Sequence, residues 1–405
     1  MAMHESSTAY RMYKFRLYRN DQKDKALRDK LFVASLVWNH FIALQKRYYR
    51  LTGKYISLVV MNQHVLKLRK TKRFGRWKTL HSQVCQNVCR RIDEGYQRFF
   101  KHLAKHPPKF RKAKKYRSFM FPQSGYVVDT LNLNQPLPNG KWTRARGAVR
   151  IDGQVYKFVQ HRPLHGTVKT LTVKRDAVGR LWLVFCVEER LVVDGEASTG
   201  KSGGFDFGLK RFLTDDEGRA YSNPEFFQQD LKKIARLSKA KAHKVEGSKH
   251  YKCARPECAK QHAHIADKRR DFHFKLAHQL CDEYDVLYFE DLNLDGMKRL
   301  WGRKVSDLGF ANFLTILKWV ALKRGKSVVQ IGRFERTTQR CSGCAVRHPM
   351  ALRDRVLTCT CGLTIDRDHN AAINIQRAGA SAHYRSDTKT PVRLRSRIEG
   401  RSPRL

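Results

Sequence analysis

The alternation of strand and helix signals after about residue 205 constrains the fold of this chain more than any other feature. Short apolar runs of strand length recur there, separated by longer segments with apolar residues at helical spacing. The strand-like runs lie at 205–213, 285–292 and 327–332, and the helical segments at about 224–245, 251–284, 309–324 and 366–378. Strands that alternate with helices favour an α/β core.

The first 190 residues predict a different organisation, with a helical block between two sets of strands. Residues 12–18, MYKFRLY, alternate apolar and basic side chains as an edge strand does. Apolar residues at helical spacing predict helices over about 22–49, 57–70 and 79–104. Two runs, 167–175 and 180–189, flank Gly179 and predict a β-hairpin. We expect the first strand to join this later region in one β-barrel, with the helical domain inserted between them.

The chain carries an excess of positive charge along its whole length. Its 405 residues include 82 Lys and Arg against 36 Asp and Glu, which gives a formal net charge of +46. A surplus of this size repels itself unless a polyanion neutralises it, and nucleic acid is the usual polyanion. Ribosomal and chromatin packing proteins share this balance but are rarely this long, and 41% hydrophobic residues indicate real cores.

The sequence predicts a cytoplasmic protein, associated with the nucleoid when it binds DNA. We find no run of about 18 apolar residues that would cross a membrane, and no apolar stretch of a signal peptide. Ten cysteines would then stay reduced, so clustered cysteines are better explained as metal ligands than as disulfides. The loosely spaced Cys253 and Cys258 lie in a basic helical segment and are expected to hold no metal.

Three acidic residues stand beside apolar segments in this basic chain. Asp206 lies between two phenylalanines, Glu290 follows an apolar strand, and Asp368 opens the last predicted helix. Carboxylates gathered at strand ends repel one another unless cations lie between them. Two Mg²⁺ ions bridged by three carboxylates would clamp the attacking water and the leaving oxygen of a phosphodiester. Taken alone, Asp366 or Asp368 is more simply a helix cap, whereas Asp206 alone fits a turn role and a functional role equally well.

A cysteine-rich insert precedes the last helix. Cys341 and Cys344 form one pair, Cys359 and Cys361 form another, and 14 residues separate the pairs. This spacing is typical of a tetrahedral structural zinc site. The second pair, Cys-x-Cys, is one residue shorter than usual, and free buried cysteines are the alternative. His348, between the pairs, could replace one thiolate.

These motifs resemble those of TnpB proteins, which are encoded by transposons. GFDFGLKRF is similar to the first motif of their RuvC-like nuclease domain, FEDLNLDGM to the second and IDRDHNAAINI to the third. RTTQRCSGC and CTCG resemble the zinc-bearing insert, and PPKFRK and KFRLY match elsewhere, so the resemblance covers nearly the whole chain. Type V CRISPR effector nucleases share the same second half, but the compact length favours TnpB.

The resemblance implies an RNA-guided DNA endonuclease, a metal-dependent phosphodiester hydrolase. Such a protein binds a transposon-derived guide RNA (omega RNA), opens double-stranded target DNA beside a short adjacent motif and cleaves both strands. The catalytic acids, which also hold two Mg²⁺ ions, would be Asp206, Glu290 and Asp368, with Asp366 in support. The structural Zn²⁺ would be held by Cys341, Cys344, Cys359 and Cys361.

The resemblance also implies an α+β multidomain fold. A wedge β-barrel with an inserted helical recognition domain would precede a RuvC-like (RNase H-like) α/β nuclease domain with a zinc-ribbon insert. The expected segments are the barrel at 1–25 and 107–192, the helical domain at 26–106, the nuclease domain at 193–340 and 364–380, the target-nucleic-acid-binding zinc insert at 341–363, and a basic, disordered tail at 381–405.

Base pairing with the guide would read most of the target, so the protein itself needs to read only the short flanking motif. By position in the resemblance, the candidates for that reading are Ser82, Gln86 and Gln123, each of which is otherwise an ordinary polar surface residue. We expect a monomer, because no heptad or exposed apolar stripe predicts a dimer seam.

Other functions stay open on the sequence. An RNA-guided repressor that binds DNA without cutting it fits the charge equally well, but it leaves the three acids without a role. A compact type V CRISPR effector would share the acids. A transposase with a DDE site is hard to exclude from three acids alone, whereas a tyrosine transposase needs a Tyr nucleophile with a His pair. The one His-x-His, His262 and His264, lies in a basic helical segment.

Overall fold

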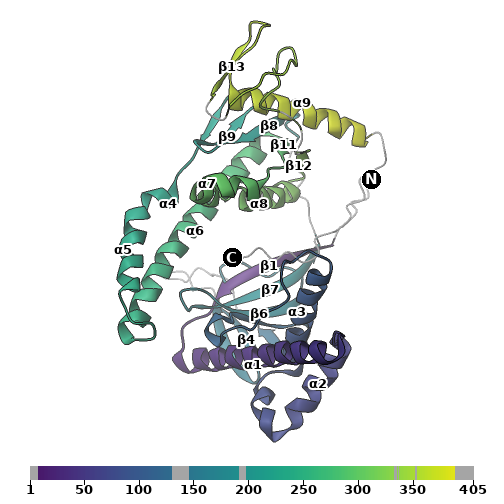
Figure 1. Ribbon diagram of the computed structural model, residues 1–405, viewed down its shortest axis with the longest axis vertical. Coiled ribbons are helices and arrows are strands. Elements are labelled where there is room, and N and C mark those ends of the chain that lie inside the picture. The colour runs from purple at the N-terminus through teal and green to yellow at the C-terminus, as the bar shows by residue number, and fades with distance from the viewer. Residues whose placement is uncertain are drawn as a thin grey trace, which may run out of the picture. The chain divides into compact units, whose positions relative to one another are not determined.

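The computed structural model describes residues 8–129, 146–190, 198–332, 335, 337–351 and 354–387. The chain divides into two compact units, Met1–Leu191 and Val192–Leu405, and each is described by itself (Figure 1). Both units combine helices with β-sheets, so the protein is a mixed α/β protein with several sheets.

The first unit is built on a four-stranded antiparallel sheet in the order β1-β7-β6-β2. Its strands are β1 (Thr8–Arg16), β2 (Ser118–Phe121), β6 (Thr167–Arg175) and β7 (Leu181–Arg190). The predicted hairpin is formed by β6 and β7, and Phe15 of β1 pairs with Leu183 of β7. The predicted pairing of the first strand with the later β region is therefore confirmed.

A second, three-stranded sheet in the order β3-β4-β5 lies in the same unit. It contains β3 (Tyr126–Asp129), β4 (Arg146–Ile151) and β5 (Gln154–Val159). Phe15 and Phe158 stack at 5.2 Å between ring centroids, so the sheets share a core, and an isolated bridge joins Leu17 to Phe158. The described strands do not close into the single barrel that the sequence predicts, because they pair as two separate sheets.

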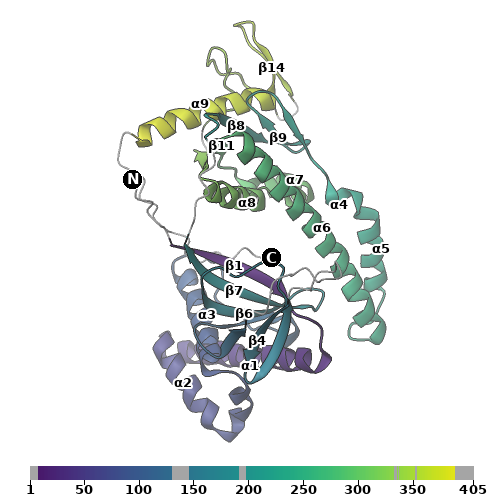
Figure 2. The same ribbon diagram turned by 180° about the vertical axis from the view of Figure 1, so that it is seen from behind.

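The helical block between β1 and β2 is present as predicted. It consists of α1 (Asp21–Thr52), α2 (Leu58–Lys70), the 3₁₀ helix η1 (Lys72–Thr79) and α3 (Ser82–Phe100), and the short η2 (Ala113–Lys115) follows. One face of α1 buries Leu31, Val37 and Phe41, and α1 and α3 both contact β2. Figures 1 and 2 show α1 along one face of the strands.

The second unit contains a five-stranded sheet in the order β10-β9-β8-β11-β12. The antiparallel strands are β8 (Ser202–Phe207), β9 (Arg211–Asp215) and β10 (Ala220–Ser222), and the strands parallel to β8 are β11 (Val286–Glu290) and β12 (Ser327–Ile331). Parallel neighbours require a crossover, which the intervening helices supply. The predicted alternation of strands and helices is confirmed.

Helices cover both faces of this sheet. One apolar face, with Phe205, Phe207 and Phe289, shares a core with α6 (Lys249–Glu283) and α8 (Phe310–Lys323). The other face is covered by α9 (Arg367–Asp387), which contacts β8, β11 and β12 (Figure 2). The remaining helices are α4 (Phe226–Gln229), α5 (Leu231–Ala242), which packs along α6, and α7 (Leu294–Leu308).

One described stretch, Lys304–Lys323, is long and apolar enough by composition to cross a membrane, against the expectation from the sequence. Gly309 interrupts it with a φ of 65° between α7 and α8. The buried side chains Phe313, Leu317 and Val320 of α8 belong to the core beneath the sheet. This stretch is therefore explained as a core helix of the second unit.

The approach of α9 to the sheet depends on glycine. A Cβ atom on Gly204 of β8 would lie 2.3 Å from the carbonyl oxygen of Ala372 and 2.4 Å from the backbone nitrogen of Gln376. A Cβ on Gly379 of α9 would lie 2.2 Å from the ring of Tyr288 in β11. Backbone and ring thus meet across this face with no room for a methyl group.

Replacing Gly204 by alanine should force α9 away from β8. Gly204→Ala is expected to lower the free energy of unfolding of the second unit by about 1–3 kcal/mol, as overpacking does. Denaturant unfolding, followed by circular dichroism, measures the change. Gly332→Ala is the matched control, because a Cβ at Gly332 meets nothing within 4 Å. Equal midpoints for the two variants would contradict the close approach.

Candidate active site and metal cluster

Asp206 occupies the fifth position of β8, where the strand pattern points its side chain toward α9. Phe205 and Phe207 on either side face the opposite core, and side chains alternate along a strand. Asp206 therefore shares its face with Gly204, the residue against which α9 packs. Only 8% of Asp206 is exposed, which is unusual for an aspartate.

Glu290 ends β11 on the same face of the sheet. The parallel register pairs Tyr288 with Gly204 and Phe289 with Phe205, so the next step places Glu290 beside Asp206. Both side chains thus lie at the carboxyl ends of neighbouring parallel strands. The hydroxyl of Thr337 donates a hydrogen bond of 3.3 Å to Oε2 of Glu290.

Asp368 comes from the first turn of α9. Its Oδ2 would lie 3.7 Å from a Cβ on Gly208, so it stands over the end of β8. Asp366 caps the same helix, because its Oδ1 accepts hydrogen bonds from the backbone nitrogens of Asp368 (2.9 Å) and His369 (3.3 Å). Asp366 therefore caps α9, and the carboxylate of Asp368 lies toward the end of β8.

The three carboxylates act on one another electrostatically. Burial raises the pKa of Asp206 well above its usual range, and the charges of Asp368 and Glu290 raise it further, while Arg367 lowers it. Burial also raises the pKa of Glu290, against the hydrogen bond from Thr337. The structure thus brings together the three acids that the sequence singled out.

This donor set fits hard divalent cations. Carboxylate oxygens are the ligands that such ions prefer, and a bound cation would offset the repulsion that raises the pKa of Asp206. Three carboxylates could hold two such ions, which lie about 3.5–4 Å apart in two-metal sites.

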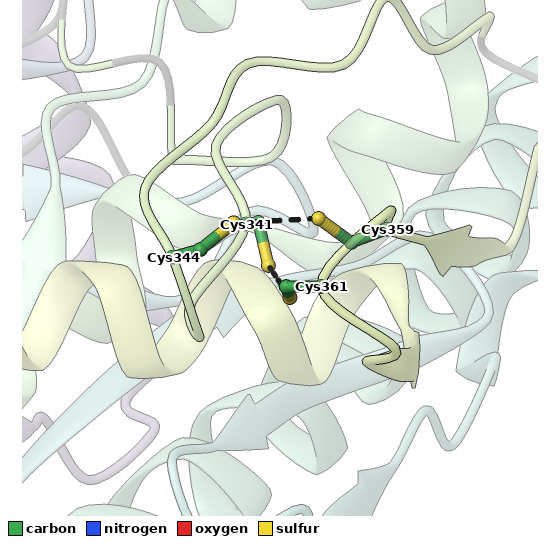
Figure 3. Close-up of side chains that lie close together, drawn as sticks. All are labelled: Cys341, Cys344, Cys359 and Cys361. Carbon is green, nitrogen blue, oxygen red and sulfur yellow. Dashed lines mark hydrogen bonds between the residues drawn. The ribbon is translucent and has the colours of Figure 1, made fainter.

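The four cysteines of the insert converge as the sequence predicts (Figure 3). One ligand atom from each of Cys341, Cys344, Cys359 and Cys361 lies within 4.8 Å of the others. The sulfurs of Cys341 and Cys361 are 3.7 Å apart, and those of Cys344 and Cys359 are 3.4 Å apart. Such a thiolate cluster suits zinc, and the short Cys-x-Cys pair does not prevent it from forming.

The cluster lies between the Cys341–Cys344 turn, here called the knuckle, and a short hairpin. The hairpin is formed by β13 (Val356–Thr358) and β14 (Thr364–Asp366). A backbone hydrogen bond from Cys361 lowers the pKa of Cys359 to about 5, with help from Cys344, Cys361 and His348. The lowered pKa favours the thiolate, the form that binds metal, at Cys359, whereas hydrogen bonds to Cys359 raise the pKa values of Cys344 and Cys361. His348 lies beside the cluster, with Nε2 3.1 Å from the sulfur of Cys359, and all four thiols are present without it.

The candidate motif-reading residues lie in the first unit. A cavity of about 270 Å³ brings Gln86 of α3 together with Gln123, which follows β2, whereas Ser82 is not in its lining. Five further polar lining residues were not predicted from the sequence: Asn62, Gln83, Asn87, Arg90 and Thr170. The residues on α3 could have been predicted from the sequence, because positions 83, 86, 87 and 90 follow helical spacing along one face of this helix.

Three family models match successive parts of the chain. Residues 8–54 match one described as "Helix-turn-helix domain", residues 185–300 one described as "Probable transposase", and residues 310–375 one described as "Cas12f1-like, TNB domain". The sheet with its carboxylates therefore falls in the second and third matches, and the cysteine cluster in the third.

Relatives match over most of the chain. A Streptomyces pristinaespiralis protein named "Putative RNA-guided DNA endonuclease" is 28% identical over 97% of this chain and 94% of its own. An Escherichia coli protein of the same designation, InsQ, is 24% identical over 91% of this chain and 92% of its own. A "TnpB-like protein" of Acanthamoeba polyphaga mimivirus is 28% identical over 56% of this chain and 47% of its own.

A solved structure shares the fold. The chain in "Cryo-EM structure of the Cas12f1-sgRNA-target DNA complex" aligns with a TM-score of 0.52 at 13% identity, over 91% of this chain and 99% of that one. The fold and site define an α/β protein with carboxylates at its strand ends and a separate thiolate cluster. In its motifs and in the relatives above, the chain is similar to TnpB-like proteins and to proteins named as RNA-guided DNA endonucleases.

Ala345 follows the knuckle with a φ of 64°, a left-handed conformation that favours glycine. Ala345→Gly should relieve this strain and tighten zinc binding by up to about 1 kcal/mol, roughly fivefold in affinity. Competition with a chromogenic chelator measures the affinity. Ala351→Gly, in the same insert and without a positive φ, is the matched control. An unchanged or weaker affinity for Ala345→Gly would show that the strain is not stored there.

Proposed function

We propose that this protein is an RNA-guided DNA endonuclease that cleaves double-stranded DNA beside a short motif. The observation that carries the proposal is the meeting of Asp206, Glu290 and Asp368 at the ends of β8 and β11 and the start of α9. The relatives named as RNA-guided DNA endonucleases, which match this chain over more than nine-tenths of its length, support it. So does the net charge of +46, which suits a long nucleic-acid footprint.

The proposed architecture follows the family. The sheet order β10-β9-β8-β11-β12 supports a RuvC-like nuclease domain over 193–340 and 364–380, with the zinc insert at 341–363. The two sheets that share a core support a wedge domain over 1–25 and 107–192, and the helical block supports a recognition domain over 26–106. We further propose a monomer that works in the cytoplasm.

Asp206, Glu290 and Asp368 would hold two Mg²⁺ ions, which when bound supply a polarised water and stabilise the leaving oxygen. The chain's own residues shape the site around them. Burial of Asp206 keeps bulk water from one side. The guanidinium groups of Arg367 and Arg355 lie 3.8 Å and 4.0 Å from the oxygens of Asp368, so positive charge stands where a DNA phosphate would approach.

Two surfaces suit the proposed nucleic-acid partners. The paired helices α5 and α6 expose many basic side chains, among them Lys232, Lys233, Arg236, Lys239, Lys252, Arg255, Lys260 and Arg270. In the first unit, the amide-lined cavity with Gln86 and Gln123 offers both donors and acceptors to a base edge. The buried Oδ1 atoms of Asn62 and Asn87 have no hydrogen-bond partner there among the described residues, which leaves acceptors for a ligand.

The first experiment is to purify the protein with its co-purifying RNA, sequence that RNA, and challenge the complex with a plasmid library. Each plasmid carries the guide-matched target with randomised flanking DNA, in Mg²⁺ or in EDTA. Loss of one flanking motif in Mg²⁺ alone supports the proposal. Binding without loss would favour a repressor, and strand transfer of a transposon end without RNA would favour a transposase.

The carboxylates can be tested one at a time. Asp206→Asn should reduce guide-directed cleavage by at least about 100-fold, since even outer-shell partners of a metal site cost 10–100-fold. Target binding by the RNA complex should stay within about twofold, because the change is isosteric. Asp271→Asn removes an exposed acid that pairs with Lys275 and is the matched control. Cleavage by Asp206→Asn at the wild-type rate would place the chemistry elsewhere.

Gln86 tests the reading of the flanking motif. If its amide contacts a base, Gln86→Ala should relax the preference at one motif position by about 10-fold, the scale of a lost bidentate contact. The plasmid library reports the preference at each position. Gln97→Ala, at an exposed position of the same helix, should leave the motif unchanged. If Gln86→Ala and Gln97→Ala both keep the wild-type motif, Gln86 does not contact the flanking DNA bases.

A further inference from the structure

Thr337 connects the acidic site to the segment that leads into the cysteine cluster. It lies between β12 and Cys341 in the chain and is 4% exposed. Its hydroxyl donates to Oε2 of Glu290 at 3.3 Å. Its carbonyl oxygen accepts from the amide nitrogen of Asn374 at 2.8 Å and from that of Asn370 at 3.5 Å. Thr337 is thus hydrogen-bonded both to the end of β11 and to α9.

Asn370 and Asn374 hold this segment along its length. The amide nitrogens of both also donate to the carbonyl oxygen of Arg340, at 2.8 Å and 2.7 Å. Oδ1 of Asn370 accepts from the backbone nitrogen of Ser342 at 2.8 Å, inside the Cys341–Cys344 knuckle. Asn370 is fully buried, and an unpaired amide there would cost about 1–3 kcal/mol per group.

The same helix carries these amides and Asp368. Asn370 and Asn374 stand one turn apart on α9, and Asp368 lies two residues before the first of them. The guanidinium of Arg377, one turn further on, donates to the carbonyl of Ser342. A shift of the segment that holds Thr337 would therefore disturb the anchoring of α9 and the hydrogen bond to Glu290 together.

We infer that Thr337 is a positioning residue for Glu290, and that the hydrogen bonds from Asn370 and Asn374 fix the position of Thr337. The inference rests on the proposed function, in which Glu290 is a metal-binding acid. Glu290 is the last residue of β11, so the sheet fixes the position of its backbone. Its side chain can still adopt several rotamers. The Thr337 hydroxyl selects one orientation of the carboxylate. The segment that leads into the zinc insert in this way contributes to the geometry of the acidic site.

The test separates the hydroxyl from the bulk of the side chain. Thr337→Val keeps the shape and removes the donor, and Thr337→Ser restores the donor without the methyl group. In single-turnover cleavage by the guide-loaded complex, Thr337→Val should be about 10–100-fold slower, the range for lost outer-shell partners. It should also need more Mg²⁺ for half-maximal rate. Thr337→Ser should recover to within about threefold of wild type.

Two readouts that do not depend on cleavage show whether the fold is intact. Target binding by the complex and bound zinc per chain, measured by elemental analysis, should both stay near wild type in Thr337→Val. Asn370→Ala should lower bound zinc as well as the cleavage rate, because it releases the knuckle at Ser342. Thr338→Val, at the next position, is the matched control and should change neither.

The outcomes distinguish this inference from the function on which it rests. If Asp206→Asn is inactive but Thr337→Val cleaves at the wild-type rate, the positioning role is overturned and the acidic site stands. A serine variant as slow as the valine variant would also overturn it, since the hydroxyl would not be the cause. If Asp206→Asn cleaves normally, the proposed site fails and the role of Thr337 fails with it.

Discussion

The contact of α9 with the central sheet of the second unit is the constraint on which the site depends. Gly204 and Gly379 let the helix backbone reach β8 and the ring of Tyr288 reach the helix, with no side chain between them. The first turn of α9 then stands over the ends of β8 and β11, and Asp368 meets Asp206 there. A helix held by longer side chains would sit further out, since packed layers are normally about 10 Å apart. The acids would then be too distant to interact strongly.

That contact brings like charges together at a buried position, and neighbouring residues offset part of the repulsion. Asp206 is taken out of water beside two like charges, and its pKa rises in response. Arg367 and Arg355 moderate the charge of Asp368, and Thr337 favours the charged form of Glu290. In a chain with a net charge of +46, acids are scarce, so those that the fold buries stand out. Buried, clustered carboxylates with neighbouring cations are the arrangement expected where divalent ions and phosphates meet.

Much of this could be predicted from local patterns, because the cause of each feature lies in adjacent residues. Phe205 and Phe207 must face one core, which sends Asp206 to the other side, and the cysteine spacing brings four thiols together. The network around Thr337 could not be predicted in the same way. Asn370 bonds Ser342 and Arg340 across some 30 positions of the sequence, and no periodicity marks such a contact. The left-handed backbone at Ala345 and the separation of the first unit into two sheets likewise depend on tertiary structure.

The pairing of β1 with β7 has a consequence for synthesis on the ribosome. Tyr10 and Glu188, 178 positions apart, are bonded across these strands, so β1 leaves the ribosome long before its partner exists. At about 5–20 residues per second, the wait is on the order of ten to forty seconds. The helices α1 to α3 can form in that time, because their contacts are local, while β1 has an open edge. Lys14 and Arg16 alternate with Tyr13 and Phe15 along it, and charge at an open edge disfavours pairing with another nascent chain.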